Sequence, residues 1–226
     1  MSWIKEIVFG RFTSLDRAIK YPKRVRKLEL SVFGYSLLDY KESFKQFVNL
    51  ENLNLHVCLS HPIVFPDELC SSQKLHTIQL LNYPLHEFPS CLATLPNLKF
   101  LYLRGHEIKT IPDFGEAAFK NLETFKIKNC ELEAVPTFLS RLKKLKSVSF
   151  AITKLTEVKG DSLPEGLVYL EIGHIETLAV IDFYKLPSTL KTVNIHSNLF
   201  NYNQKFENYA MIKEIESSNV SYKILY

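Results

Sequence analysis

Apolar residues between positions 95 and 112 (LPNLKFLYLRGHEIKTIP) follow two different periods. Leu98 and Leu101 are three residues apart, whereas Leu101 and Leu103 are two apart. A step of three is typical of a helix, and a step of two is typical of a strand whose alternate side chains face the same way. The segment therefore predicts two elements, a short strand and a connecting arm with its own apolar side chains.

The same pattern of an apolar residue, two other residues, and two apolar residues one position apart recurs eight times. The units begin at residues 25, 50, 75, 98, 122, 145, 167 and 190, so their spacing stays between 22 and 25 residues. Such regular self-similarity predicts a stacked repeat architecture. One residue of each unit should share a buried row, namely Leu28, Leu53, Ile78, Leu101, Phe125, Val148, Leu170 and Val193. A slip of one residue would turn every one of these side chains outward.

Residues 98–112 and 122–136 resemble most closely the leucine-rich repeat LxxLxLxxNxLxxLP. The chain as a whole resembles leucine-rich-repeat proteins of the bacterial type, with repeats of about 23 residues. This resemblance implies an α/β fold, a solenoid with a concave parallel sheet and a convex side of short helical turns and extended arms. It implies about eight repeats and, for most members, a role as a binding scaffold.

We expect a single domain over residues 1–226, with an N-terminal cap (1–24), repeats (25–200) and a C-terminal cap (201–226). The first cap should contain a helix over 14–21 that begins at Ser14 and ends before Pro22. The second should contain a helix near 208–217 and a strand over 220–226. Segments 88–95 and 135–142 follow prolines and predict helical turns.

The residue three positions after each strand pattern is an asparagine in the family, but here that residue type occurs only at Asn198. The eight positions hold Phe33, Cys58, Tyr83, His106, Cys130, Thr153, Ile175 and Asn198. We therefore expect local breaks near Phe33 and Ile175, where the side chain offers no hydrogen bond. His106 should be a structural donor, and Cys58 and Cys130 should be buried, reduced and inert.

The remaining cysteines, Cys70 and Cys91, lie in connecting arms. A disulfide between them stays open at this point, and no cysteine or histidine spacing is typical of a metal site. No run of 18 apolar residues occurs, so no membrane span is expected, and the first residues have too short an apolar stretch for a signal peptide. These features favour a cytoplasmic monomer, although a signal sequence upstream of Met1 stays an open alternative.

A net charge of +4 is mild for 226 residues. The basic clusters KRVRK (23–27) and RLKKLK (141–146) are interpreted as solvated repeat surface rather than as a phosphate-binding stripe. Aromatic residues do not alternate with these lysines as they do in nucleic-acid platforms, so no nucleic acid is expected as a partner.

No catalytic arrangement emerges on the expected concave face. Glu29 and Glu171 lie six repeats apart, too far for a carboxylate pair, and Ser147 and Ser149 have no histidine in neighbouring units. Nucleotide-binding glycine motifs are also missing from the sequence. We expect no enzymatic activity, no cofactor and no metal.

One group of residues on that face predicts a protein-binding site. Phe100, Tyr102 and Arg104 alternate along one strand, Lys126 and Lys128 lie on the next, and Tyr169 completes the predicted site. Aromatic and arginine side chains dominate binding energy at protein interfaces.

The hypothesis is a non-enzymatic scaffold that binds a protein through the concave face. One alternative is a secreted or surface-displayed factor that binds host or cell-envelope proteins or glycans, and an oxidised Cys70–Cys91 pair would favour it. A second alternative is an enzyme inhibitor or regulatory subunit.

Overall fold

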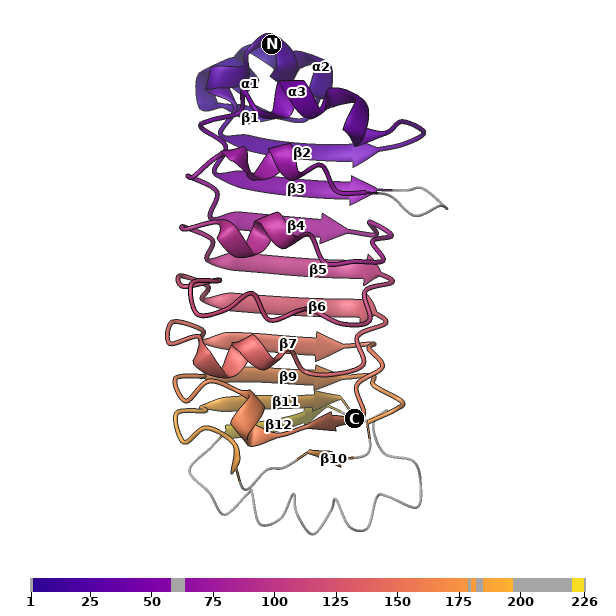
Figure 1. Ribbon diagram of the computed structural model, residues 1–226, viewed down its shortest axis with the longest axis vertical. Helices are drawn as coiled ribbons and strands as arrows, with labels where there is room; N and C mark the ends of the chain where they lie inside the picture. The colour runs from indigo at the N-terminus through magenta and orange to yellow at the C-terminus, as the bar shows by residue number, and fades with distance from the viewer. Residues whose placement is uncertain (1, 58–63, 179, 182–184, 197–220, 226) are drawn as a thin grey trace.

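The computed structural model describes residues 2–57, 64–178, 180–181, 185–196 and 221–225, and shows one large parallel sheet with short helical turns on one side. Ten strands pair in the order β1-β2-β3-β4-β5-β6-β7-β9-β11-β12 and stack along the length of the molecule (Figure 1). The strands are β1 Arg11–Phe12, β2 Lys27–Val32, β3 Asn52–Val57, β4 Thr77–Leu81, β5 Phe100–His106, β6 Thr124–Cys130, β7 Ser147–Ala151, β9 Tyr169–Gly173, β11 Thr192–His196 and β12 Ser221–Leu225. Two short strands, β8 Glu157–Val158 and β10 Val180–Ile181, form a separate parallel pair.

The predicted register of the strands is confirmed. The eight residues of the expected buried row align from strand to strand, and none of their side chains is more than 1% exposed. Burying a side chain of this size stabilises the folded state by roughly 1.5–3 kcal/mol. The row is therefore the main source of cohesion between units that have little core of their own.

Short helices lie in the connections, mostly on the arm side of the sheet. They are α1 Ser2–Phe9, α2 Leu15–Lys20, η1 Pro22–Arg24, η2 Leu37–Tyr40, α3 Lys41–Phe44, η3 Asp67–Ser71, η4 Ser90–Thr94, η5 Thr137–Arg141 and η6 Gly160–Ser162. The helical turns predicted after Pro89 and Pro136 are confirmed as the 3₁₀ helices η4 and η5, and η3 follows Pro66 in the same way. Proline fixes φ and has no N–H to leave unpaired, so it suits the start of such a turn.

Phenylalanine replaces leucine in the middle of the core. The rings of Phe119 and Phe138 stack with their centroids 4.9 Å apart, and Phe125 contacts Phe138 and Phe150 edge to face. Phe119 belongs to the connection between β5 and β6, which forms turns but contains no helix. Its ring fills the core in place of the apolar side chains that a 3₁₀ helix supplies in neighbouring arms.

The two ends of the described chain agree with the sequence in part. Helix α2 begins after Ser14 and ends before Pro22 as predicted, but the Ser14 side chain makes no capping hydrogen bond. Helix α1 and strand β1 were not predicted. Strand β12 confirms the strand expected over 220–226, whereas the helix expected near 208–217 lies outside the described residues.

At six of the described turn positions, a residue next to that position lies in the left-handed backbone region. Directly before the turn positions 83, 106, 130, 153 and 175, this residue is Asn82, Gly105, Asn129, Ile152 or His174, each with φ between 51° and 74°. In the first unit the left-handed residue is Gly34, which follows the turn position, and Phe33 is 62% exposed. The expected irregularity near Phe33 is therefore confined to the turn, because β2 pairs with β3 without interruption. The break expected near Ile175 is wrong, because Ile175 is fully buried and β9 pairs with β11 without interruption.

Buried polar groups replace the family's asparagine at three turn positions. Nε2 of His106 donates to the carbonyl oxygen of Leu80 at 3.0 Å, and Sγ of Cys130 donates to the carbonyl oxygen of Lys128 at 3.2 Å. Tyr83 donates its hydroxyl to the carbonyl oxygen of Val64. Cys130 is a free, buried thiol as predicted, and burial raises its pKa to about 11. Its low reactivity stays a prediction, and Cys58 lies outside the described residues.

A second series of side chains connects successive units at the amino ends of the strands. Asn49, Asn97 and Asn121 immediately precede a strand pattern, and each donates its amide to the carbonyl oxygen of Lys23, Gln73 or Pro96 in the preceding unit, at 2.6–2.8 Å. Thr189 makes the equivalent contact with the carbonyl oxygen of Glu165. These bonds satisfy main-chain groups that a solenoid turn leaves without partners.

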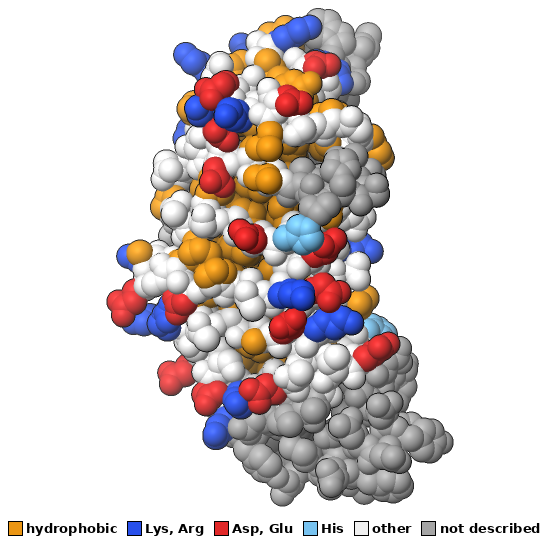
Figure 2. All heavy atoms as spheres, turned by 45° about the vertical axis from the view of Figure 1, so that its right-hand side comes forward, with side chains coloured by type: hydrophobic (Ala, Val, Ile, Leu, Met, Phe, Trp, Pro, Cys, Tyr) orange, Lys and Arg blue, Asp and Glu red, His pale blue; other side chains and the backbone are white. Residues whose placement is uncertain are grey.

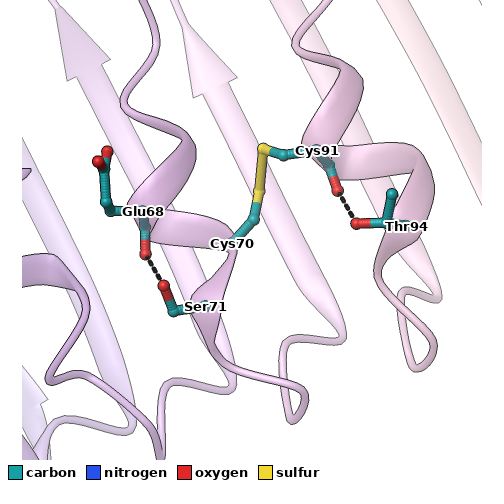
Figure 3. Close-up of a disulfide and its surroundings, with 5 residues drawn as sticks. All are labelled: Glu68, Cys70, Ser71, Cys91 and Thr94. Carbon is teal, nitrogen blue, oxygen red and sulfur yellow. Dashed lines mark hydrogen bonds between the residues drawn. A yellow bond between two sulfur atoms is a disulfide. The ribbon is translucent and has the colours of Figure 1, made fainter.

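Cys70 in η3 and Cys91 in η4 form a disulfide across neighbouring arms (Figure 3), which settles the pairing that the sequence left open. Their Cα atoms are 6.0 Å apart, a usual separation for a disulfide. Both helices are also closed by their own hydroxyl groups, since Ser71 donates to the carbonyl oxygen of Glu68 and Thr94 to that of Cys91.

Ile152 should be under backbone strain, because a β-branched residue rarely adopts a positive φ. The change Ile152→Asn introduces the residue type that Asn82 and Asn129 use at the same position. We expect it to raise the free energy of unfolding by about 1 kcal/mol, measured by urea denaturation. The matched reverse change, Asn129→Ile, should lower it by a similar amount. If both changes raised the free energy of unfolding, or both lowered it, the explanation by backbone strain would be wrong.

Burial lowers the pKa of His106 to about 4 although its backbone hydrogen bonds oppose the shift. The unfolded chain, with an ordinary histidine pKa, then binds more protons than the folded one between about pH 6.5 and 4. Stability should therefore fall by roughly 2 kcal/mol between about pH 7 and pH 5 because of this group. Urea titrations at both pH values should show a smaller loss for His106→Asn, and an identical loss in both proteins would refute a role for His106.

Candidate functional site

The side chains that alternate with the buried row form the face of the sheet opposite the arms, here called the open face. Its middle row runs Glu29, Asn54, Gln79, Tyr102, Lys126, Ser149, Glu171 and Asn194, each in register with the next. Most of these side chains are half-buried because their strand neighbours flank them on both sides. The residues predicted for the binding site all lie on this face.

Strand β5 carries the centre of the candidate site. Phe100 and Tyr102 are half-buried and Arg104 is exposed, so the three side chains present an aromatic surface that ends in a guanidinium group. Polar threonines flank Phe100, since its register partners are Thr77 and Thr124. Within the described part of the chain, neither Arg104 nor its neighbour Lys126 forms an ion pair.

Leu81 belongs to this site although the sequence did not single it out. It is in register with Arg104, and its side chain is half-buried on the open face rather than in the core. Together with Phe100 and Tyr102 it extends the apolar surface over two strands. The sequence does indicate this position, because Leu81 directly follows Leu80, the last inward-facing leucine of its strand, and must therefore face the other way.

Lys128, the second lysine of the predicted site, forms an ion pair on the open face. Its Nζ lies 2.7 Å from Oε1 of Glu171, and Ser149 donates its hydroxyl to Oε2 of the same carboxylate at 2.8 Å. Lys128 is on β6 and Glu171 on β9, so the pair passes over β7. That strand offers only the small side chains of Ser149 and Ala151 there, which leave room for the lysine. Of the two lysines, Lys126 thus supplies the positive charge next to Tyr102, with which it is in register.

Tyr169 is separated from the β5 residues. Strands β6 and β7 lie between β5 and β9, a distance of about 14 Å at the usual strand spacing. Its hydroxyl accepts a hydrogen bond from the amide of Asn194 at 2.9 Å. The structure therefore brings together Phe100, Tyr102, Arg104 and Lys126 and places Tyr169 outside this group.

The surface at the carboxyl ends of the strands is a weaker candidate for binding a partner. At the carboxyl ends of the strands, acidic, basic and histidine side chains alternate over short distances (Figure 2), as in the ion pairs His86–Glu107 and Lys109–Glu133. Charges of opposite sign that neutralise each other give no field to attract a charged partner. The open face around β5 differs because, within the described residues, Arg104 and Lys126 form no ion pair there, although Lys128 does.

A search of the described residues finds no group of three or more His, Cys, Asp or Glu side chains placed to hold a metal ion. None of the described helices has the length and apolarity that crossing a bilayer requires.

Comparisons with known proteins give one partial likeness. No family model matches the chain. Over 112 residues, or 48% of its length, the chain is 38% identical to "Disease resistance protein RPS4B" of Arabidopsis thaliana. The match covers 9% of that protein, so the chain spans only a small part of its length. The parallel sheet and this match fit a leucine-rich-repeat-like protein.

Removal of the Glu171 carboxylate tests whether the Lys128–Glu171–Ser149 network is structural. Glu171→Ala leaves the fully buried Ser149 hydroxyl and the half-buried Lys128 ammonium without their partner. We expect a loss of about 1–3 kcal/mol in the free energy of unfolding, measured with urea. The control Glu123→Ala removes the exposed partner of Lys99 and should cost less than about 1 kcal/mol. Equal losses would mean that the network is no more than a surface ion pair.

Proposed function

We propose that this protein is a leucine-rich-repeat solenoid that acts as a binding scaffold, without catalysis or cofactor, and holds a protein partner against the open face of its sheet. The parallel sheet, the regular register and the partial match to a disease resistance protein support a role in protein interaction. A fold of this kind serves many partners, so the argument for a binding mode depends on the surface itself.

The observation that carries the proposal is the group on β4, β5 and β6. Leu81, Phe100 and Tyr102 form an apolar surface, and Arg104 and Lys126 lie at its edge. Interface hot spots combine aromatic and arginine side chains, surrounded by contacts that exclude water. Half-buried rings also lose little conformational entropy on binding, because neighbouring strands already restrict them.

The charges at this site define the chemistry of the partner. Arg104 and Lys126 remain available, whereas Lys128 is neutralised by Glu171. A suitable partner offers an apolar side chain for the rings and one or two carboxylates for the cations. Electrostatic complementarity of this kind favours specificity and a high association rate.

The length and pairing of strands β5 and β6 also suit them to carry a binding surface. Each is seven residues long, and their pairing extends to His106 and Cys130 beyond the turn of the backbone. Long paired strands over a packed aromatic core hold the side chains in fixed positions. Such rigidity lowers the entropic cost of association.

Truncation of the Tyr102 or the Arg104 side chain should weaken partner binding and leave the fold intact. Tyr102→Ala and Arg104→Ala should each weaken partner affinity by about 2 kcal/mol or more, because their side chains would be buried in the complex. Partners are first captured from native lysate with the unchanged protein, and affinities are then measured by calorimetry. The melting temperature should change little, since neither side chain is part of the core.

The control for this experiment is Lys154→Ala, an exposed lysine in the connection that follows β7, two strands from β5 and outside the residues that we assign to binding. Equal affinity of the Tyr102, Arg104 and Lys154 variants, at unchanged melting temperature, would remove the β5 surface from consideration.

A secreted or surface-displayed binding factor is the second candidate. The observation that favours it is the Cys70–Cys91 disulfide, because such bonds persist in oxidising compartments and are rare in the cytosol. The other cysteine for which the structure gives a state, Cys130, is a buried thiol, so it is compatible with either compartment.

Thiol labelling separates the two locations. If the protein resides in an oxidising compartment, alkylation of freshly isolated, denatured protein should modify Cys58 and Cys130 but not Cys70 and Cys91. The bond closes a loop of 21 residues, which corresponds to about 3 kcal/mol of stabilisation. The Cys70→Ser, Cys91→Ser double variant should lose this amount and should match reduced wild type. Complete alkylation of all four cysteines would favour the cytoplasmic location.

A further inference from the structure

The positive charge of this protein is concentrated at one end of the sheet. Residues 1–32 contain eight Lys and Arg and three Asp and Glu, a net charge of +5, whereas the whole chain has +4, so the other residues together carry −1. This segment contains α1, β1, α2, η1 and β2, and β1 is the edge strand of the ten-stranded sheet (Figure 1). The molecule therefore has a cationic end and a nearly neutral body.

Two of the three carboxylates in this segment are already paired. Glu6 is buried, and its Oε2 lies 3.0 Å from the guanidinium of Arg17. Glu29 lies on the open face, where it pairs with Arg11 at 2.7 Å and with Lys27 at 3.0 Å. These pairs neutralise three of the cations and leave the others with their charge.

The third carboxylate, Asp16, lies toward the connection that follows β2. Burial, Tyr40 and the charge of Asp16 raise the pKa of Tyr35, so Asp16 lies near that ring. Tyr35 comes after the carboxyl end of β2. Asp16 is thus placed away from the amino end of the same strand.

Four cations remain at the amino end of β2. Lys20, Lys23 and Arg24 are exposed, and none of them forms an ion pair with another residue of the described chain. Arg26 lies 3.8 Å from the carboxylate of Glu51, and both side chains are largely in solvent, so this pair is weak. Four positive charges therefore lie within seven residues, at the end of α2 and in η1.

Two apolar side chains project beside these cations. Val8 and Phe9, at the end of α1, are 65% and 69% exposed. The next residue, Gly10, accepts a hydrogen bond from the main-chain N–H of Arg26 at 2.8 Å. A Cβ atom on Gly10 would lie 2.5 Å from the carbonyl oxygen of Arg24 and 3.0 Å from Cγ of Arg26, so the two segments are in contact. The end of α1 is thus fixed against the basic segment.

The combination of free cations and protruding apolar side chains selects among anionic partners. A nucleic acid offers phosphates to the cations but no apolar medium for Val8 and Phe9. A protein interface gains most from side chains that are restricted before association, whereas these two are mostly surrounded by solvent. The interface of an anionic bilayer attracts basic residues and accepts apolar side chains without a shaped pocket.

We propose that this cationic end binds the surface of an anionic lipid bilayer. Val8 and Phe9 enter the headgroup region, and the segment Lys20–Arg26 lies against the charged headgroups. Neither attraction is strong alone, but an apolar insertion and a polybasic segment together give stable association. The basic sequence KRVRK (23–27), interpreted above as solvated surface, then has a binding role. The inference does not depend on the open-face function, because its residues lie outside that surface.

The test measures flotation with vesicles in a density gradient. One kind of vesicle is phosphatidylcholine alone, and in the other phosphatidylserine replaces about a third of it. The unchanged protein should float with the anionic vesicles and remain unbound with the neutral ones, and high salt should release it because screening weakens the attraction. Failure to float with the anionic vesicles, or equal flotation with both kinds, would overturn the proposal.

Two variants separate the two contributions. The triple variant Lys20→Gln, Lys23→Gln, Arg24→Gln should lose at least tenfold in partition coefficient, since each basic residue near an anionic surface contributes about a factor of five. Phe9→Ser should lose about tenfold, as expected for a ring that is partly withdrawn from water in the bound state. Both variants should keep their melting temperature, because the substituted side chains are exposed.

Each variant has a matched control. The triple change Lys120→Gln, Lys143→Gln, Lys154→Gln removes the same charge from exposed lysines of the connections between β5 and β9. Phe33→Ser removes a ring of similar exposure, 62%, from the carboxyl end of β2. Both controls should float as the unchanged protein does. An equal loss in the lysine control would reduce the effect to net charge, an equal loss in Phe33→Ser would reduce it to general apolarity, and either result would overturn the proposal.

Two further results would assign the binding elsewhere. Tighter binding to a glutamate-rich peptide or a single-stranded oligonucleotide than to anionic vesicles, unaffected by Phe9→Ser, would assign the cations to a soluble polyanion and overturn the proposal. Tyr102→Ala should float as the unchanged protein does. Loss of flotation in this variant would move the lipid contact to the open face.

Discussion

The structure depends on one packing constraint, the alignment of apolar side chains in register across parallel strands. Each unit is too small to have a core of its own, so the side chains of the buried row are covered by the arm of their own unit and by neighbouring units together, as Phe138 and Phe150 cover Phe125. Because side chains alternate along a strand, the same register decides which residues face outward. The binding surface is therefore a consequence of the core: once Leu101 and Leu103 are buried, Phe100, Tyr102 and Arg104 must share the open face.

This constraint explains what could be predicted. The strand positions, the buried row and the facing of the candidate residues follow from a period that repeats in the sequence. The position of Leu81 on the open face follows from the same rule, although the sequence alone did not assign it to the binding site. The prolines before η4 and η5 also marked their helices, since proline acts on the local backbone alone.

Other features could not be predicted, because they depend on side chains from units that are not adjacent in sequence. Lys128 and Glu171 are 43 residues apart and meet only because the strand between them carries serine and alanine. The turn positions show the same limit. The sequence indicates that most of them lack the family's asparagine, but it does not show which carbonyl oxygen each replacement reaches, such as that of Leu80 for His106 and that of Val64 for Tyr83.

One departure from regularity lies in the fourth unit, in the connection between β5 and β6. A perfectly regular solenoid presents the same surface in every unit and offers a partner no distinct place to bind. The connection between β5 and β6 omits its helix, fills the core with Phe119 instead, and is fixed to the next arm by Asp113 and Arg141. On the open face, the two strands that this connection joins are seven residues long, and β5 carries the aromatic side chains, so the irregular unit is also the one that carries the surface we assign to binding.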